Sequence, residues 1–210
     1  MLAAALFCAD TAEARTKVRA GLRVLRMEPQ GDDAEDFSDA NWGGGLYADI
    51  QPSGNKFLSF STGVDIVHMM SQTIEFRDRL TGLRIEQQTR QFFTRFYAGL
   101  RLGPQGRGTL RPYVESNLAL HYYSITTDVV IPDDRSYEDE IRQNLDREGE
   151  TAFGFDVGGG LEIRVARRVF LDFGAKYVKS FGVPQQLGPE SEEISPDYIQ
   201  IFLGVAYQFN

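Results

Sequence analysis

The stretch Ile199-Gln-Ile-Phe-Leu-Gly-Val-Ala-Tyr-Gln-Phe209 decides the fold of this chain. Its odd-numbered positions are all apolar, and most of its even-numbered positions hold Gln, Gly or Ala. Successive side chains of a β-strand point to opposite faces, so this stretch predicts a strand with one apolar and one polar face. Its length suits a tilted strand that crosses a bilayer, which needs about 9–11 residues.

Seven earlier segments repeat this period of two. They lie at 17–26, 42–51, 58–66, 92–102, 111–123, 153–165 and 169–177. The links at 52–55, 103–110 and 166–168 are short, whereas those at 27–41, about 68–91, 124–151 and 179–197 are long, polar and rich in acidic residues. Short turns that alternate with long loops are typical of an antiparallel membrane barrel with an even number of strands. We therefore predict an all-β fold, an eight-stranded antiparallel up-and-down transmembrane β-barrel.

One long link carries a strand signal of its own. Apolar and polar residues alternate in Thr73-Ile-Glu-Phe76 and in Leu83-Arg-Ile-Glu86, on either side of Thr81-Gly82. Two alternating segments around a glycine-containing turn are typical of a β-hairpin. The third and fourth strands are therefore predicted to continue outside the membrane as a hairpin.

Composition excludes several classes of protein. The 210 residues hold 22 Lys+Arg and 30 Asp+Glu, with 42% hydrophobic residues and a mean hydropathy of −0.31. These values argue against both a helical-bundle membrane protein and a fully disordered chain. The net charge of −8, with the two signs interspersed, argues against nucleic-acid binding. One cysteine excludes an intramolecular disulfide and two histidines disfavour a zinc site, so we predict neither a metal nor a cofactor.

The first residues predict a targeting segment. Residues 2–9 are apolar, and Ala12-Glu-Ala14 supplies the small-x-small pattern that signal peptidase accepts. We interpret residues 1–14 as a signal peptide and residues 15–210 as the barrel domain; a disordered or helical extension is the alternative. The bulky Phe7 before Cys8 disfavours a lipid anchor.

Two kinds of barrel fit the alternation. In a soluble lipocalin-like barrel the apolar face would line a cavity, whereas in a membrane barrel it faces lipid. The polar face combines glycines with charges of both signs, which suits a narrow interior, and the other face is rich in Phe, Leu, Val and Tyr. Aromatic residues near the strand ends are predicted to form interfacial girdles. These are Trp42, Tyr122, Tyr177, Tyr198 and Tyr207.

The chain resembles the small eight-stranded outer-membrane β-barrel family, the group of the OmpA transmembrane domain and the opacity-type porin-like proteins. The resemblance covers about residues 15–210 and rests on the number of strands, the rhythm of the loops and the ending Tyr207-Gln208-Phe209, which Asn210 follows. It implies an integral protein of a Gram-negative outer membrane, in contact with outer-membrane lipid and lipopolysaccharide. It also implies that Tyr207 and Phe209 form the signal that the barrel-assembly machinery reads in the last strand.

Charged residues on the inward face are the candidate site. The predicted inward charges are Arg19, Arg23, Asp49, Asp65, Arg95, Arg101, Glu115, Asp156, Glu162, Arg164, Asp172 and Lys176. Buried ions must be paired, and a small barrel leaves little room beyond its side chains, so we predict a salt-bridged network that fills the lumen. The alternative is a gate, in which a pair such as Arg101 and Glu115 changes partners and opens a narrow water path.

An enzyme is a third hypothesis. Some barrels of the family that this chain resembles modify lipid A with a His, a Ser and an acid. Here His121 with Ser124, and His68 with Ser71, have a spacing that points the two side chains to opposite faces of a strand. We therefore predict no enzymatic activity and interpret both histidines as polar residues that line the mouth.

The predicted function is a structural or surface-interaction role, in which long acidic loops could bind an extracellular ligand. A narrow porin-like channel for small solutes is the alternative. Acidic groups within 32–36 and 138–140 offer oxygen ligands for Ca²⁺ or Mg²⁺, but they lack EF-hand spacing, so solvated loops are the favoured interpretation.

Overall fold

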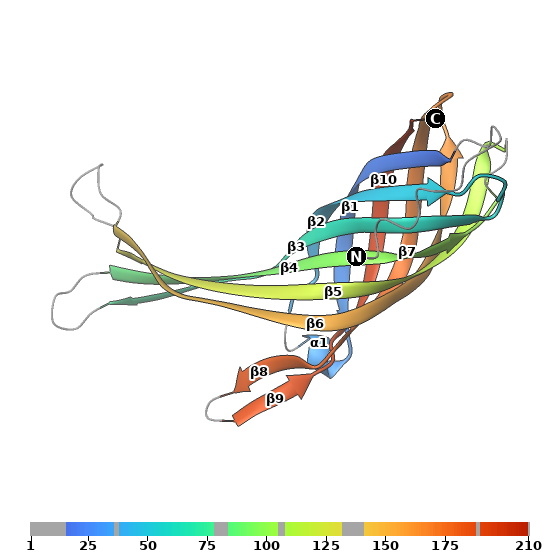
Figure 1. Cartoon of the computed structure of the whole chain (residues 1–210). Helices are drawn as coiled ribbons and strands as arrows, with labels where there is room; N and C mark the ends of the chain where they lie inside the picture. The colour runs from blue at the N-terminus through green and yellow to red at the C-terminus, as the bar shows by residue number, and fades with distance from the viewer. Residues whose placement is uncertain are drawn as a thin grey trace, which may run out of the picture.

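Eight strands close into one antiparallel barrel in the computed structural model, which describes residues 16–35, 38–77, 84–104, 108–131, 141–187 and 190–209 (Figure 1). Around the barrel the order is β1-β10-β7-β6-β5-β4-β3-β2. The bounds are β1 Lys17–Gln30, β2 Asn41–Gln51, β3 Leu58–Arg77, β4 Arg84–Leu102, β5 Leu110–Ile131, β6 Ile141–Arg164, β7 Val169–Phe181 and β10 Asp197–Gln208. The predicted eight-stranded up-and-down barrel is confirmed. The predicted signal peptide, residues 1–14, lies outside the described residues.

Strand pairing fixes the tilt of the strands relative to the barrel axis. A row of paired residues that starts at Val18 of β1 and crosses every strand returns to β1 at Glu28. This shift of ten residues, from position 18 to position 28, requires the strands to run obliquely to the barrel axis. Closure also pairs the backbone of β1 with that of β10, so the barrel wall has no free edge to expose to lipid.

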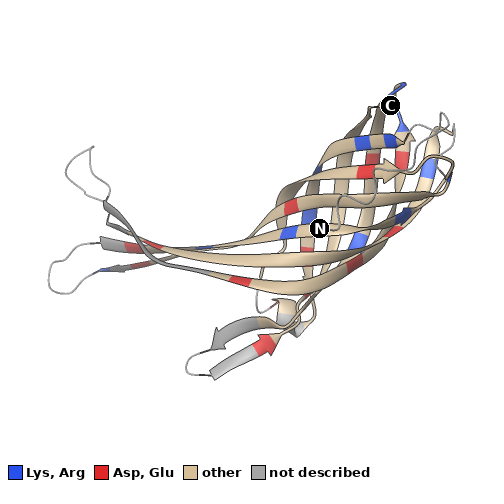
Figure 2. Cartoon of the chain, viewed as in Figure 1, with Lys and Arg blue, Asp and Glu red and all other residues tan. Residues whose placement is uncertain are grey.

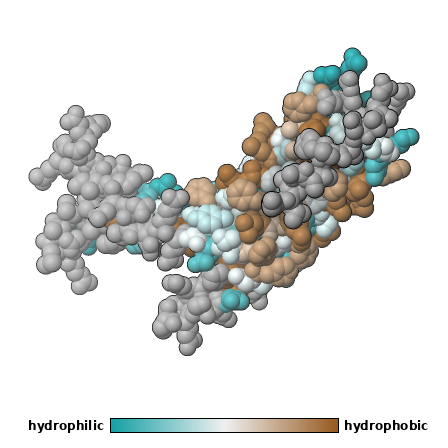
Figure 3. Space-filling view, viewed as in Figure 1, coloured by the Kyte–Doolittle hydropathy of each residue, from teal (hydrophilic) through white to brown (hydrophobic). Residues whose placement is uncertain are grey.

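The apolar face of each strand points outward. Leu203 on β10 is 59% exposed, whereas its neighbour Phe202 and the charged Arg95 on β4 are buried. In Figure 3, apolar residues cover the visible outer wall of the barrel. The lipocalin-like alternative, with an apolar lumen and a polar outer face, is therefore wrong.

Aromatic residues flank this apolar belt at both ends. Trp42 and Tyr122 are exposed near the end of the barrel that carries the long links, which we call the loop mouth, and Tyr207 is exposed near the opposite turn mouth. Tyr198 departs from the predicted girdle, because it is fully buried in the lumen. Its even number places it on the inward face of β10, beside the buried Gln200.

Four strands continue beyond the barrel and project from the loop mouth as a curved sheet (Figure 1). The predicted hairpin of the third and fourth strands is confirmed, since β3 and β4 pair as far as Arg77 and Arg84. The link at 124–151 was predicted as a loop, and this is wrong: β5 and β6 pair from Ser124 and Gly149 out to Ile131 and Ile141. Outside lipid both faces of a strand can be polar, so this region carries no period-two signal.

The two remaining links also contain secondary structure. A short helix, α1 Asp32–Glu35, follows β1, and a hairpin of β8 Val183–Leu187 and β9 Glu190–Ile194 joins β7 to β10. Ala34 and Val183 are buried in the same apolar cluster, which closes this side of the loop mouth. Within the described residues, no helix is long and apolar enough to span a membrane.

Candidate functional site

Arg101 is the centre of an ion cluster in the turn-mouth half of the lumen. Its guanidinium lies 2.9 Å from Asp49, 3.0 Å from Glu115, 3.0 Å from Glu162 and 3.6 Å from Asp172. All five side chains are at least 97% buried. In so dry a setting each charge depends on its neighbours for compensation, so the cluster behaves as one unit.

A second cluster forms around Asp65, further toward the loop mouth. The carboxylate of Asp65 accepts two hydrogen bonds from Arg23, at 2.8 and 2.6 Å, and another from Arg95. Arg95 also lies 3.4 Å from Asp156, and the amine of Lys176 pairs with Asp156 and with Glu115 of the first cluster. Lys176 and Asp156 therefore join the two clusters into one network across the lumen.

Aromatic rings and a glycine make room for these long side chains. The Arg101 guanidinium lies 4.0 Å from the ring centre of Tyr113, whose hydroxyl donates a hydrogen bond to Asp172 at 2.6 Å. Such cation–π contacts are favourable in desolvated sites. Gly45 sits beside Asp65, and a Cβ at Gly45 would come within 2.0 Å of its carboxylate oxygen. A larger residue at position 45 would therefore displace the carboxylate.

The structure places eleven of the twelve predicted lumen charges in this interior. They are Arg19, Arg23, Asp49, Asp65, Arg95, Arg101, Glu115, Asp156, Glu162, Asp172 and Lys176. Figure 2 marks the positions of the acidic and basic residues along the strands. Arg164, at the end of β6, is only half-buried at the turn mouth. The sequence analysis missed the buried Arg111, although its odd number gives it the inward parity of Glu115 on the same strand.

A second, apolar layer lies between the ion network and the loop mouth. It consists of inward-facing residues near the loop ends of the strands, together with Ala34 of α1 and Val183 of β8. The barrel residues of this layer include Leu25, Met27, Val67, Met69, Phe93, Tyr123, Val178, Tyr198 and Phe202. Sequence reasoning did not predict this layer, because it treated inward positions as polar. The signal was nevertheless present, since Leu25 and Phe93 have inward parity in their predicted strands.

His121 lies inside the apolar layer, not at the mouth as predicted. It is fully buried against the ring of Phe93, and its Nδ1 lies 2.6 Å from the hydroxyl of Ser180, which lies 2.7 Å from that of Tyr123. Ser124, its predicted partner, is on the opposite face of β5 and only half-buried. A base and a hydroxyl enclosed in this way have no contact with the outer surface where a lipid substrate would lie.

The acidic groups that sequence analysis offered to a metal ion give no site in the described part of the chain. Among those residues, no three His, Cys, Asp or Glu side chains come together as they would around a metal. Residues 138–140 and Asp36 lie outside the described residues.

The projecting sheet is the other candidate site. Beyond the barrel rim, β3 pairs only with β4 and β6 only with β5 among the described residues. Exposed neutral polar residues follow one edge, at Ser71, Gln72 and Thr73. In the middle of the sheet the hydroxyls of Thr89 and Thr127 lie 3.3 Å apart, so one donates a hydrogen bond to the other and links β4 to β5.

The outer membrane protein beta-barrel domain family matches residues 1–209. The chain belongs to this family. It is accordingly an integral protein of the outer membrane, as its apolar belt and closed sheet require. In such barrels the short turns face the periplasm and the long connections face outward. No curated protein matches this chain significantly.

Solved structures of other proteins are similar to this chain at low sequence identity. Neisserial surface protein A matches with a TM-score of 0.54 and 14% identity, over 92% of this chain and 97% of that one. A major outer membrane protein of Thermus thermophilus matches with a TM-score of 0.49 and 12% identity, over 91% and 99% of the two chains. Ail of Yersinia pestis, solved with the heparin analogue sucrose octasulfate, gives a TM-score of 0.48 and 12% identity, over 92% and 97%.

Proposed function

We propose that this outer-membrane barrel does not conduct, and that it holds the projecting sheet of β3–β6 at the cell surface as an interaction surface. The observation that carries the proposal is the filled lumen: the ion network occupies the turn-mouth half and the apolar layer occupies the loop-mouth half. A barrel with such an interior is a rigid support, and binding residues are commonly found on segments that a rigid scaffold positions.

The composition of the projecting sheet supports an interaction role. The exposed hydroxyl and amide side chains of Ser71, Gln72 and Thr73 lie along one edge, beside the exposed apolar Ile74. An ion pair between Arg90 and Asp128, at 3.1 Å, joins β4 to β5, so these two charges leave the surface close to neutral there. Such a surface suits an extracellular ligand that is read by hydrogen bonds.

Shortening one hairpin tests the interaction role. Ile125 and Glu148 face each other in the sheet, so replacing residues 126–147 with Asn-Gly joins them through a tight turn and leaves the barrel wall intact. Cells that display the shortened protein should adhere less to immobilised extracellular-matrix proteins than cells that display the wild type. The shortened protein and the wild type should reach the same level at the cell surface and show the same heat-dependent gel mobility. Equal adhesion of the two kinds of cell would contradict the proposal. Arg167→Ala, at the opposite mouth, is the control variant.

Conductance measurements separate the filled barrel from a channel. The network offers Arg101 several carboxylates, which is the feature that a gate with changing partners would use. We expect the wild type to stay silent in planar bilayers and Glu115→Gln to stay silent as well, because the apolar layer remains in place. Discrete openings in Glu115→Gln, absent from the wild type, would favour a narrow channel.

Enzymatic activity is not part of this proposal. The enclosed group of His121, Ser180 and Tyr123 is supported on all sides by buried residues, which is the setting of a structural polar contact. We also propose that Tyr207 and Phe209, whose exposed rings lie 5.1 Å apart at the end of β10, serve as the assembly signal for the barrel-assembly machinery.

A further inference from the structure

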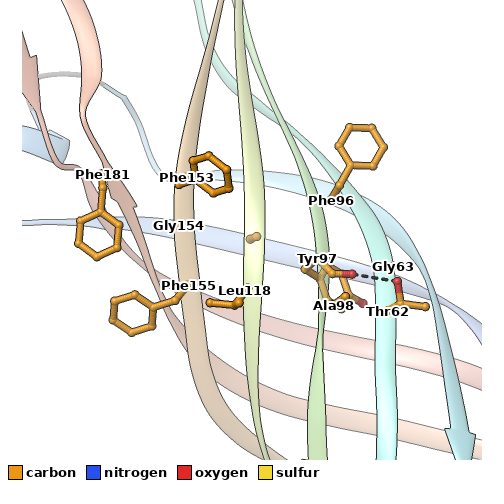
Figure 4. Close-up of a pocket in the computed structure, with 11 residues that line it drawn as sticks. Thr62, Gly63, Phe96, Tyr97, Ala98, Leu118, Phe153, Gly154, Phe155 and Phe181 are labelled. Atoms are coloured by element: carbon orange, nitrogen blue, oxygen red, sulfur yellow. Dashed lines mark hydrogen bonds between the residues drawn. The ribbon is translucent and has the colours of Figure 1, made fainter. Parts of the chain in front are cut away.

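The apolar groove on the outer wall of the barrel holds no charge. It has a volume of about 720 Å³, and no charged side chain is among the described residues that line it (Figure 4). The hydroxyl of Thr62 in this groove donates a hydrogen bond to the backbone carbonyl of Tyr97 at 2.9 Å. The groove therefore offers a polar ligand no charged partner, and in this respect it differs from the turn mouth.

Basic residues gather at the turn mouth. Four of them lie at the strand ends and in the turns, and we call them the basic rim. They are Lys17 at the start of β1, Lys56 between β2 and β3, Arg164 at the end of β6 and Arg167 between β6 and β7. The acidic residues in the described part of this mouth are instead buried in the ion network, at Asp49, Glu162 and Asp172. The rim is thus basic in a chain whose net charge is −8.

The charges buried inside the lumen cancel one another. Among the described residues, the basic ones are Arg19, Arg23, Arg95, Arg101, Arg111 and Lys176. The acidic ones are Asp49, Asp65, Glu115, Asp156, Glu162 and Asp172. Because these two sets are equal in number, the basic rim adds positive charge to a neutral interior. Like charges gathered around one opening create a field that attracts anions.

Two lysines of the basic rim share a small pocket. Lys17 and Lys56 both line it, at the turn between β2 and β3, and its volume is about 190 Å³. The side-chain oxygen of Asn55 accepts hydrogen bonds from the backbone amides of Phe57 and Leu58, both at 2.9 Å, and so holds this turn in place. The shape of the turn therefore does not depend on its lysine, and the pocket has room for one carboxylate group.

The basic rim faces the opening of the barrel and not the surrounding lipid. Lys17 and Arg164 have the parity of the buried lumen residues on their strands, and the other two residues lie in turns beyond the strand ends. Arg168 is a contrast, because its guanidinium donates a hydrogen bond to the hydroxyl of Tyr207 on the outer face, at 3.3 Å. A ligand of the rim would therefore approach from the aqueous side, along the barrel axis.

We propose that the basic rim binds an acidic segment of a periplasmic polypeptide, with one carboxylate in the pocket of Lys17 and Lys56 and others beside Arg164 and Arg167. The short turns of such barrels face the periplasm. The opening of an eight-stranded barrel is narrow, so the side chains of one extended peptide can reach its inward-facing basic residues. The filled lumen behind the rim stops the segment there, so it docks on the barrel and does not enter it.

Removal of the pocket lysines tests the acidic-peptide site. Lys17→Gln combined with Lys56→Gln removes two positive charges from the rim, and both side chains are exposed, so the barrel is expected to fold. Arg26→Gln combined with Lys179→Gln is the matched control, because it removes two positive charges at the loop mouth. Heat-dependent gel mobility checks that both variants fold. Lys56→Gln alone changes only a turn residue and keeps the test valid if the double variant folds poorly.

The readout is the binding of a fluorescent oligoglutamate peptide, measured by anisotropy, to barrels in phosphatidylcholine nanodiscs, which leave both mouths accessible. We expect the wild type and the control to bind equally. The double variant should bind about tenfold more weakly and Lys56→Gln about threefold more weakly, as the loss of contacts between exposed charges implies. Added salt should weaken binding to the wild type, and oligoglutamine should not bind.

Three results would overturn the proposal. The first is equal binding of oligoglutamate by the wild type and the double variant. The second is loss of wild-type binding when phosphatidylglycerol enters the nanodiscs, because lipid headgroups would then occupy the rim. The third is sedimentation of the wild type with purified peptidoglycan, lost in the double variant, without any binding of oligoglutamate, which would assign the rim to the cell wall.

Discussion

Replacement of Arg101 by alanine is expected to lower the free energy of unfolding of the barrel by about 3–5 kcal/mol, the usual cost of removing one partner of a buried ion pair. Arg101 has four carboxylates within 4 Å, and the substitution leaves them with fewer cations in a dry interior. The nearest remaining cations are Arg19, which already pairs with Glu162 and Asp49, and Lys176, which already pairs with Glu115. The destabilisation should therefore appear in urea unfolding in lipid vesicles.

A surface arginine provides the control for Arg101. Arg26 pairs with Glu28 at 3.0 Å, but both side chains are about two-fifths exposed. Exposed pairs of this kind contribute about 0–1 kcal/mol, so Arg26→Ala should change the free energy of unfolding by no more than that. If Arg101→Ala costs as little as Arg26→Ala, the lumen is hydrated enough to screen its charges and the filled-barrel interpretation fails.

Leu203→Arg is the second substitution with a large expected effect. Leu203 lies in the middle of β10 and faces outward with 59% exposure, so an arginine there would lie near the middle of the bilayer. An arginine at that depth costs about 2–4 kcal/mol in outer-membrane barrels. The same urea unfolding measurement in vesicles gives this value.

A leucine of equal exposure provides a control that separates the effect of depth in the membrane from the effect of the change from leucine to arginine. Leu110 is also 59% exposed, but it is the first residue of β5 and lies at the turn mouth. Near the interface an arginine costs about 0–1 kcal/mol, so Leu110→Arg should be close to neutral. Similar costs at the two positions would show that the membrane does not lie where the apolar belt places it.

Sequence alone was sufficient for the barrel. For the lumen charges, strand parity assigned eleven residues that are buried, but it included the half-buried Arg164 and the analysis missed Arg111. The period of two is a property of the strand itself, and a membrane imposes it by requiring an apolar outer face. Arg95 and Asp156 could therefore be assigned to the lumen from parity. Their burial in the structure follows that assignment.

One failure of sequence reasoning lies where the membrane no longer acts. In the projecting part of β5 and β6 neither face must be apolar, so the link at 124–151 was predicted as a loop although residues 124–131 pair with residues 141–149. A second failure has a different cause. Tyr198 was placed in the outer girdle because it lies near a strand end, although its even number gives it the inward parity of the other buried residues of β10.

Parity determines which side of the wall a residue faces, and this information is present in the sequence. Contacts across the lumen are decided only by the tertiary structure, because they depend on the tilt of the strands. The ten-residue shift around the barrel brings Arg101 of β4 against Asp49 of β2 and Asp172 of β7, which are far apart in the chain.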